Sequence, residues 1–226
     1  MSKILPLQNN MGKIRKISIG DVFAIKIENT DYYYFGRILF DVKEQYKEKI
    51  ENHNYLGWHG KSVLIETYKT ISKTPEISEF KVILNGTFVP KKTLLSEDIT
   101  IIKNIPVNHK KVSFPEVFQD VHMTGILFSL GELTILTSFD TKYVDKTKVF
   151  PTLGNMYYIQ LATLDYSGRR DLIEYQEDII DNYFRDSDLR SFPEIRKEIY
   201  KDIGEDPNMS YYELALKHGF DLARFY

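Results

Sequence analysis

The sequence predicts an α+β protein, in which a mainly antiparallel, barrel-like β portion is followed by a three-helix C-terminal tail. Short runs of β-branched and aromatic residues, separated by turn residues, continue to about residue 164. Beyond residue 168 the apolar residues recur at helical spacing, and two capping-box patterns follow. We therefore predict a β-rich domain over residues 1–166 and a helical tail over residues 167–226, packed on or beside it.

The first two strands are expected over residues 22–27 and 32–40. Both are rich in β-branched and aromatic residues, and turn-forming residues separate them. In the first strand Phe23, Ile25 and Ile27 share one parity, which predicts a strand with a single buried face.

Six later apolar runs predict the remaining strands. They cover residues 63–67, 80–84, 99–102, 126–128, 133–137 and 156–164. Asn85-Gly86 and Leu130-Gly131-Glu132 interrupt the pattern and predict tight turns. Short strands joined in this way favour a small antiparallel barrel or a strongly bent sheet.

A polar segment separates the second strand from the third. Residues 42–50 predict a short helix or a polar excursion, and residues 53–60 predict a loop that holds the only tryptophan, Trp58. Because tryptophan is highly buried on average, we expect Trp58 in the interior.

The tail predicts three helices. The first has apolar residues at helical spacing, at Leu172, Tyr175, Ile179, Ile180 and Tyr183. The second begins with a capping-box spacing at Ser191 and Glu194, and the third repeats that spacing at Ser210 and Glu213. Glycines follow the second and third helices as natural stops.

The composition excludes several classes of protein. A net charge of −2 disfavours a globally basic nucleic-acid binder. The absence of cysteine excludes structural disulfides, Cys-ligated zinc and thiol catalysis. No apolar run approaches the roughly 20 residues that cross a bilayer, and the N-terminal residues lack the apolar stretch of a secretory signal. We therefore expect a cytoplasmic protein with no membrane partner.

The usual catalytic templates do not fit. Gly60-Lys61-Ser62 resembles the end of a phosphate-binding loop, but Tyr55 stands where that motif needs a glycine. The five histidines show no metal-ligand spacing, and no serine lies in a nucleophile-elbow context. We therefore predict no enzymatic activity, no catalytic residues, no cofactor and no metal site.

The first tail helix is strongly acidic. Glu174, Glu177, Asp178 and Asp181 follow i, i+3, i+4, i+7 spacing and share one helix face. Residues 170–226 hold 8 basic and 14 acidic residues, a net charge of −6, which leaves +4 for the rest of the chain. Like charges at this spacing destabilise an isolated helix, so the pattern needs an explanation. A solvated face, a partner-binding surface and a carboxylate metal site all remain open.

The stretch GDVFAIKI, followed by YYYFGRILF, resembles the start of the immunity protein 26 family of bacterial polymorphic toxin systems. The pattern is carried by Gly20, Asp21, Phe23, Ala24, Ile25, Phe35, Gly36, Arg37 and Ile38. The resemblance implies an intracellular antidote that is encoded beside a toxin and acts by binding it. It brings no catalytic residues, and we expect the motif positions, Gly20, Asp21, Phe23, Phe35, Gly36 and Arg37, to be structural.

Two alternatives remain. The PemK/MazF ribonuclease toxins also open with Gly-Asp and an apolar strand on a small barrel, but they have a proline where Ile38 follows Arg37 here.

An aromatic platform for single-stranded nucleic acid at Tyr32 to Phe35 would need basic residues along one face, and only Arg37 is near, so packing is the expected role of that row. The other alternative is a protein-interaction module with no toxin partner.

In an antidote, the acidic helix face could serve as the surface that binds the toxin. A toxin that acts on nucleic acid, such as a nuclease, needs a basic cleft because its substrate is a polyanion. Carboxylates on the antidote can occupy that cleft in place of phosphates. We therefore predict the toxin contact at Glu174, Glu177, Asp178 and Asp181. The sequence leaves open which toxin is bound and in which oligomeric state.

Overall fold

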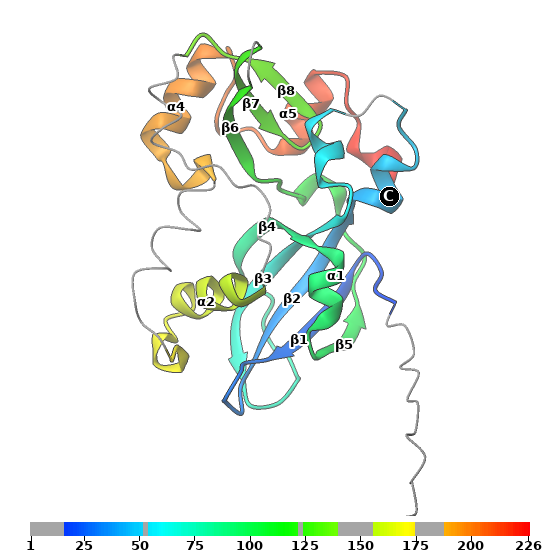
Figure 1. Cartoon of the computed structure of the whole chain (residues 1–226), viewed down its shortest axis with the longest axis vertical. Coiled ribbons are helices and arrows are strands. Elements are labelled where there is room, and N and C mark those ends of the chain that lie inside the picture. Colours follow the sequence, from blue (N-terminus) through cyan, green and yellow to red (C-terminus); the bar gives the residue numbers. More distant parts are fainter. Residues whose placement is uncertain (1–15, 52–53, 122–123, 140–155, 175–187) are drawn as a thin grey trace, which may run out of the picture.

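A computed structural model describes residues 16–51, 54–121, 124–139, 156–174 and 188–226, which form two antiparallel sheets with helices around them (Figure 1). The five-stranded sheet has the order β4-β3-β2-β1-β5 and the three-stranded sheet the order β6-β7-β8. Their strands are β1 (Asp21–Lys26), β2 (Tyr33–Asp41), β3 (Ser62–Ser72), β4 (Val82–Pro90), β5 (Ile99–Asn104), β6 (Glu116–Val121), β7 (Gly125–Leu130) and β8 (Leu133–Leu136). The α+β class with antiparallel sheets is confirmed. Neither described sheet closes on itself, so a closed barrel is not supported.

The helices of the described residues are short. The α-helices are α1 (Lys91–Ser96), α2 (Met156–Tyr166), α4 (Pro193–Asp202) and α5 (Tyr211–Lys217). A π-helix, η1 (Val42–Lys47), confirms the helical option for residues 42–50. Single 3₁₀ turns are η2 (Tyr55–His59), η3 (His109–Lys111), η5 (Arg170–Leu172), η6 (Leu189–Ser191) and η7 (Leu222–Phe225).

The five-stranded sheet has two different faces. One face packs on α2 through a large apolar cluster that includes Phe23, Tyr34 and Met156. The opposite face carries a much smaller cluster, with Phe35 and Tyr68 at its centre. Neighbouring residues of β2 therefore enter different clusters, as the alternation of a strand requires.

Helix α2 replaces the last predicted strand, so the strand prediction for residues 156–164 is wrong. This segment is apolar at nearly every position, and a short apolar run does not distinguish a buried strand from a buried helix. Met156, Ile159 and Thr163 lie on one helical face. The Thr163 hydroxyl donates to the Ile159 carbonyl at 2.7 Å and lies 2.8 Å from the Thr67 hydroxyl of β3, which fixes the helix on the sheet.

The three-stranded sheet and the C-terminal helices share a second core with one end of the large sheet. Phe40 and Phe88 from the large sheet join Phe128 from β7, Tyr200 from α4 and Leu214 from α5 in this cluster. Figure 1 shows α4 and α5 beside β6, β7 and β8, at the end of the molecule away from α2.

The predicted helix starts in the tail have different outcomes. The Ser210–Glu213 capping box is present at the start of α5 and is confirmed. The Ser191 capping box is wrong, because α4 begins at Pro193 and Phe192 precedes it without a side-chain cap. The first predicted tail helix begins at Leu172, which lies in the 3₁₀ turn η5, and residues 175–187 lie outside the described residues, so the three-helix tail is supported only in part.

The two predicted turns also differ in outcome. The turn at Gly131-Glu132 joins β7 to β8, where Leu130 pairs with Leu133, and is confirmed. Asn85-Gly86 lies inside β4, so that turn is wrong. Gly86 has φ +51°, and a Cβ there would collide with the carbonyl of Ser113. The glycine is needed for the close approach of a neighbouring backbone, not for a turn.

Two burial expectations are wrong. Both faces of β1 are covered, since Phe23 and Ile25 enter the cluster under α2 and Val22 and Ala24 enter the opposite cluster, and only Lys26 is exposed. Trp58 is 69% exposed, because η2 directs Tyr55, Leu56 and His59 inward and leaves the tryptophan outside, with its ring 5.6 Å from that of Tyr55.

His59 is the buried titratable group of this loop. Its ring stacks on Phe88 with 4.2 Å between centroids and an interplanar angle of 6°, and the ring of Tyr55 meets it edge-on at 5.1 Å. Burial lowers the pKa of His59 from 6.5 to about 4. The folded state therefore holds the imidazole in its neutral form, and protonation of His59 destabilises the fold.

We predict that His59 makes the fold sensitive to acid. The pKa is lower in the folded than in the unfolded chain, so its contribution is complete above pH 6.5 and is lost as the pH falls through about 4. Over that window the wild type should lose about 3 kcal/mol more free energy of unfolding than His59→Leu. Urea denaturation of both proteins between pH 7.5 and 4 measures the difference. Parallel pH profiles would show that His59 does not cause the acid sensitivity.

Candidate functional site

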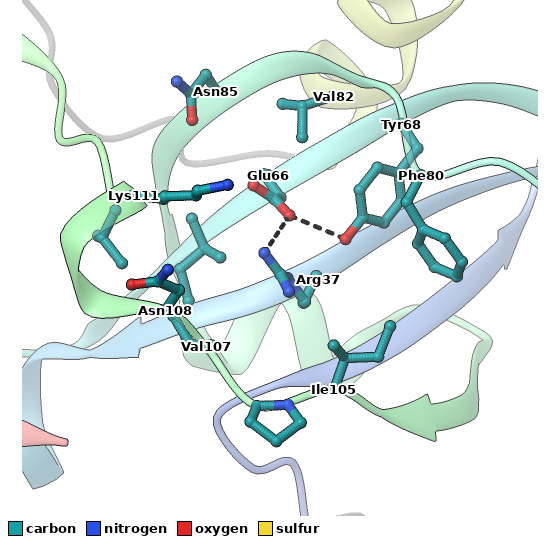
Figure 2. Close-up of a pocket in the computed structure, with 13 residues that line it drawn as sticks. Arg37, Glu66, Tyr68, Phe80, Val82, Asn85, Ile105, Val107, Asn108 and Lys111 are labelled. Carbon is teal, nitrogen blue, oxygen red and sulfur yellow. Dashed lines mark hydrogen bonds and ion pairs between the residues drawn. The ribbon is translucent and has the colours of Figure 1, made fainter.

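A pocket lies on the face of the large sheet that is turned away from α2 (Figure 2). Its volume is about 590 Å³, which is within the range of ligand-binding cavities. Strands β2, β3 and β4 form its floor, and the connection between β5 and β6 forms a wall. The lining residues are Arg37, Leu39, Glu66, Tyr68, Phe80, Val82, Asn85, Ile105, Pro106, Val107, Asn108, Lys111 and Val112.

A polar triad forms the floor of the pocket. Arg37 of β2 pairs with Glu66 of β3 across the sheet, and the Arg37 Nη2 lies 2.8 Å from the Glu66 Oε1. The Tyr68 hydroxyl donates to the same oxygen at 2.9 Å, as the dashed lines of Figure 2 show. The side chains of Arg37 and Glu66 are 20% and 7% exposed. Burial, and then the neighbouring Glu66 charge, raise the pKa of Tyr68, so its hydroxyl remains a donor at neutral pH.

Arg37 retains hydrogen-bonding capacity beyond this pair. Its guanidinium group has five N–H donors, and the buried Nε has no hydrogen-bond partner among the described residues. Lys111 lines the same pocket and forms no ion pair with the described carboxylates. The pocket therefore holds two cations and one carboxylate, a net positive charge.

The rim of the pocket is apolar and exposed. Phe80 and Val82 are 36% and 39% exposed, values that are high for large apolar side chains. The Lys103 ammonium lies 4.2 Å from the centroid of the Phe80 ring and adds a cation to the rim. The pocket can thus accept an anionic group at its floor and an apolar group at its edge.

The other motif residues shape the backbone around this pocket. The Asp21 carboxylate accepts from the Ser18 backbone and from the Asn104 side chain, both at 2.8 Å, and so joins β1 to β5. A Cβ on Gly36 would lie 2.7 Å from the Glu66 carbonyl and would collide with the Phe23 ring, so β2 and β3 can approach only because residue 36 is glycine.

The aromatic row at the start of β2 fills space. Tyr34 and Phe35 are buried on opposite faces of the sheet, and Tyr33 packs beside the smaller cluster. The Tyr32 ring is partly buried, with the Arg169 guanidinium 4.7 Å from its centroid. None of the four lines the pocket.

The predicted acidic face is described only at its first residue. Glu174 accepts a hydrogen bond from the Asn29 side chain at 3.2 Å, in an exposed position. Glu177, Asp178 and Asp181 lie outside the described residues. The assignment of this face to toxin binding stays a prediction.

No cluster of three or more His, Asp or Glu side chains in the described residues could hold a metal ion. A second cavity is lined by Glu28, Asp31, Glu97 and Asp98, and burial together with Glu28 raises the pKa of Glu97. Within the same ranges, no helix is long and apolar enough to span a bilayer.

The fold is of the α+β class, and an amphipathic, cationic recess lies on an open face of its large sheet. Residues 18–122 match the immunity protein 26 family, a span that includes every residue lining the pocket. The resemblance indicated by residues 20–40 is thereby confirmed and extended, although the match covers just under half of the chain. No curated protein and no solved structure matches the chain.

Sequence reasoning identified only Arg37 among the pocket residues. Glu66 had a recognisable signal, since a carboxylate inside the apolar run VLIETY must find a cationic partner if that strand is buried. Lys111 and Phe80 had no such signal, because their positions depend on how the connections cross the sheet.

We predict that loss of one partner of the Arg37–Glu66 pair destabilises the fold more than loss of both. Arg37→Met leaves a buried carboxylate without its cation and should lower the free energy of unfolding by about 3 kcal/mol, whereas Arg37→Met combined with Glu66→Leu should recover most of that loss. Lys26→Met, at an exposed pair with Asp31, should cost less than about 1 kcal/mol. Urea denaturation measures all three. Equal losses in the single and double variants would contradict the pairing.

Proposed function

We propose that this chain is a cytoplasmic immunity protein that neutralises a cognate bacterial toxin by binding it directly. The observation that carries the proposal is the family match over residues 18–122. That family is one of immunity proteins, which points to toxin neutralisation, and direct binding achieves neutralisation without any catalytic step.

The chemistry of Arg37 supports binding over RNA cleavage. A PemK-like ribonuclease would use its arginine on the substrate, whereas Arg37 is paired with the buried Glu66. These contacts favour a non-enzymatic protein.

A nuclease toxin would suit the acidic face. We propose that Glu174, Glu177, Asp178 and Asp181 enter the basic cleft of the toxin in place of its polyanionic substrate. Charges of this kind mainly accelerate association and set its dependence on salt.

The proposed function predicts protection of living cells. Expression of the toxin domain encoded beside this gene should stop growth, and co-expression of this chain should restore it. Colony counts measure the outcome. Growth arrest that persists despite soluble immunity protein would overturn the proposal, and hydrolysis of RNA by the purified chain, abolished by Arg37→Ala, would favour the PemK-like alternative.

If the acidic face contacts the toxin, removing its charges should slow the electrostatically steered association of the two proteins. Changing its four carboxylates to alanine should lower the association rate at low salt by about tenfold or more and flatten the salt dependence, with little loss of stability. Surface plasmon resonance at several salt concentrations measures both. The control, with the same change in net charge, replaces the exposed carboxylates Glu48, Glu76, Glu194 and Glu198. If both quadruple variants bind alike, the acidic face is not the contact.

A further inference from the structure

The open sheet face is built differently from the face under α2. Helix α2 covers one side of the large sheet, while the other side ends in the pocket above Arg37, Glu66 and Tyr68. Two of the large apolar side chains that are exposed in the described residues, Phe80 and Val82, stand together at this pocket. Exposed apolar side chains around a recess mark a docking surface.

The charges of the pocket specify what docks. Lys111 and Lys103 have no carboxylate partner among the described residues, and the Arg37 side chain, 20% exposed, lines the same pocket. Glu66 is already satisfied by Arg37 and Tyr68. The complementary group is therefore an oxygen-bearing anion that is attached to an apolar neighbour.

We propose that this pocket is a toxin-binding site in which an Asp or Glu side chain of the toxin meets Arg37 and Lys111, while an adjoining apolar side chain packs on Phe80 and Val82. The inference rests on the proposed function and adds a second contact, of opposite charge, to the predicted acidic face. Buried arginine and aromatic side chains surrounded by apolar contacts are the usual centres of protein interfaces.

A protein side chain fits the pocket better than a nucleic acid does. A single-stranded nucleic acid needs a track of cations that follows its phosphates, with aromatic faces on which bases stack. Here the cations surround one recess instead of following a track, and Lys103 already lies over the Phe80 ring, where a base would have to stack. One carboxylate with an apolar neighbour meets these constraints.

The test measures binding of the neighbouring gene's toxin domain to the full chain. Lys111→Glu should lower the association rate by about tenfold, and Val82→Asp should raise the dissociation rate by about tenfold. The matched controls are Lys92→Glu, on the exposed side of α1, and Leu136→Asp, at a 61% exposed position of β8. Both controls should bind like the wild type. Thermal unfolding checks that all four variants are folded.

A charge exchange identifies the partner group. One Asp→Lys or Glu→Lys change in the toxin should weaken binding to the wild type and restore binding to Lys111→Glu. If the wild type protects and binds but both pocket variants behave like their controls, the pocket proposal is overturned and the proposed function stands. A wild type that neither binds nor protects overturns both. Binding of a labelled 20-nucleotide RNA that Lys111→Glu abolishes would reassign the pocket to nucleic acid.

Discussion

Strand β2 has both of its faces buried, and this constraint governs the large sheet. Its side chains enter the α2 cluster and the opposite cluster in turn, because one face of the sheet packs on α2 and the other carries the smaller cluster. A strand in this position must be apolar at nearly every residue, since an unpaired charge there is costly. The two charged residues of β2 are each paired: Arg37 with Glu66, which lies opposite it on β3, and Asp41 with Lys91. The need to pair Arg37 with Glu66 therefore helps to fix the register between β2 and β3.

The wall of the pocket is held by residues far from it in the sequence. The connection that carries Lys111 contacts the C-terminal segment, where the His109 ring lies 5.3 Å from that of Tyr212 and 6.0 Å from that of Tyr226. The Tyr226 hydroxyl also donates to the carbonyl of Leu39, a floor residue, at 2.6 Å. The pocket lies within the family-matched residues, yet its shape depends on C-terminal residues outside that match.

The sequence predicted the parts of the fold that local patterns determine. Strands β1 and β2, the β7–β8 turn and the cap at Ser210 each follow from residue type and spacing within a few positions. Helix α2 was missed because a continuous apolar segment fits the periodicity of a helix and that of a strand equally well. Its docking on β3 through Thr163 and Thr67 selects the helix. Gly86 was misassigned because the backbone that approaches it is 27 residues further along the chain, at Ser113. The pocket was beyond prediction for the same reason, since its walls are brought together by tertiary contacts.

Stability alone does not account for the Arg37–Glu66 pair. Replacement of a buried ion pair by apolar residues of similar volume is often neutral or stabilising, because removing two charges from water costs as much as their attraction returns. An apolar pair at these positions would serve a sheet that is buried on both faces equally well. What the pair adds is a guanidinium group held in a fixed orientation at the floor of an open recess, with N–H donors beyond those that Glu66 accepts. A rigid donor array of this kind loses little entropy when an anion binds, so it is useful to a protein that recognises a partner. The Arg37 guanidinium group therefore has two roles: it pairs with Glu66 within the sheet, and it gives the pocket its positive charge.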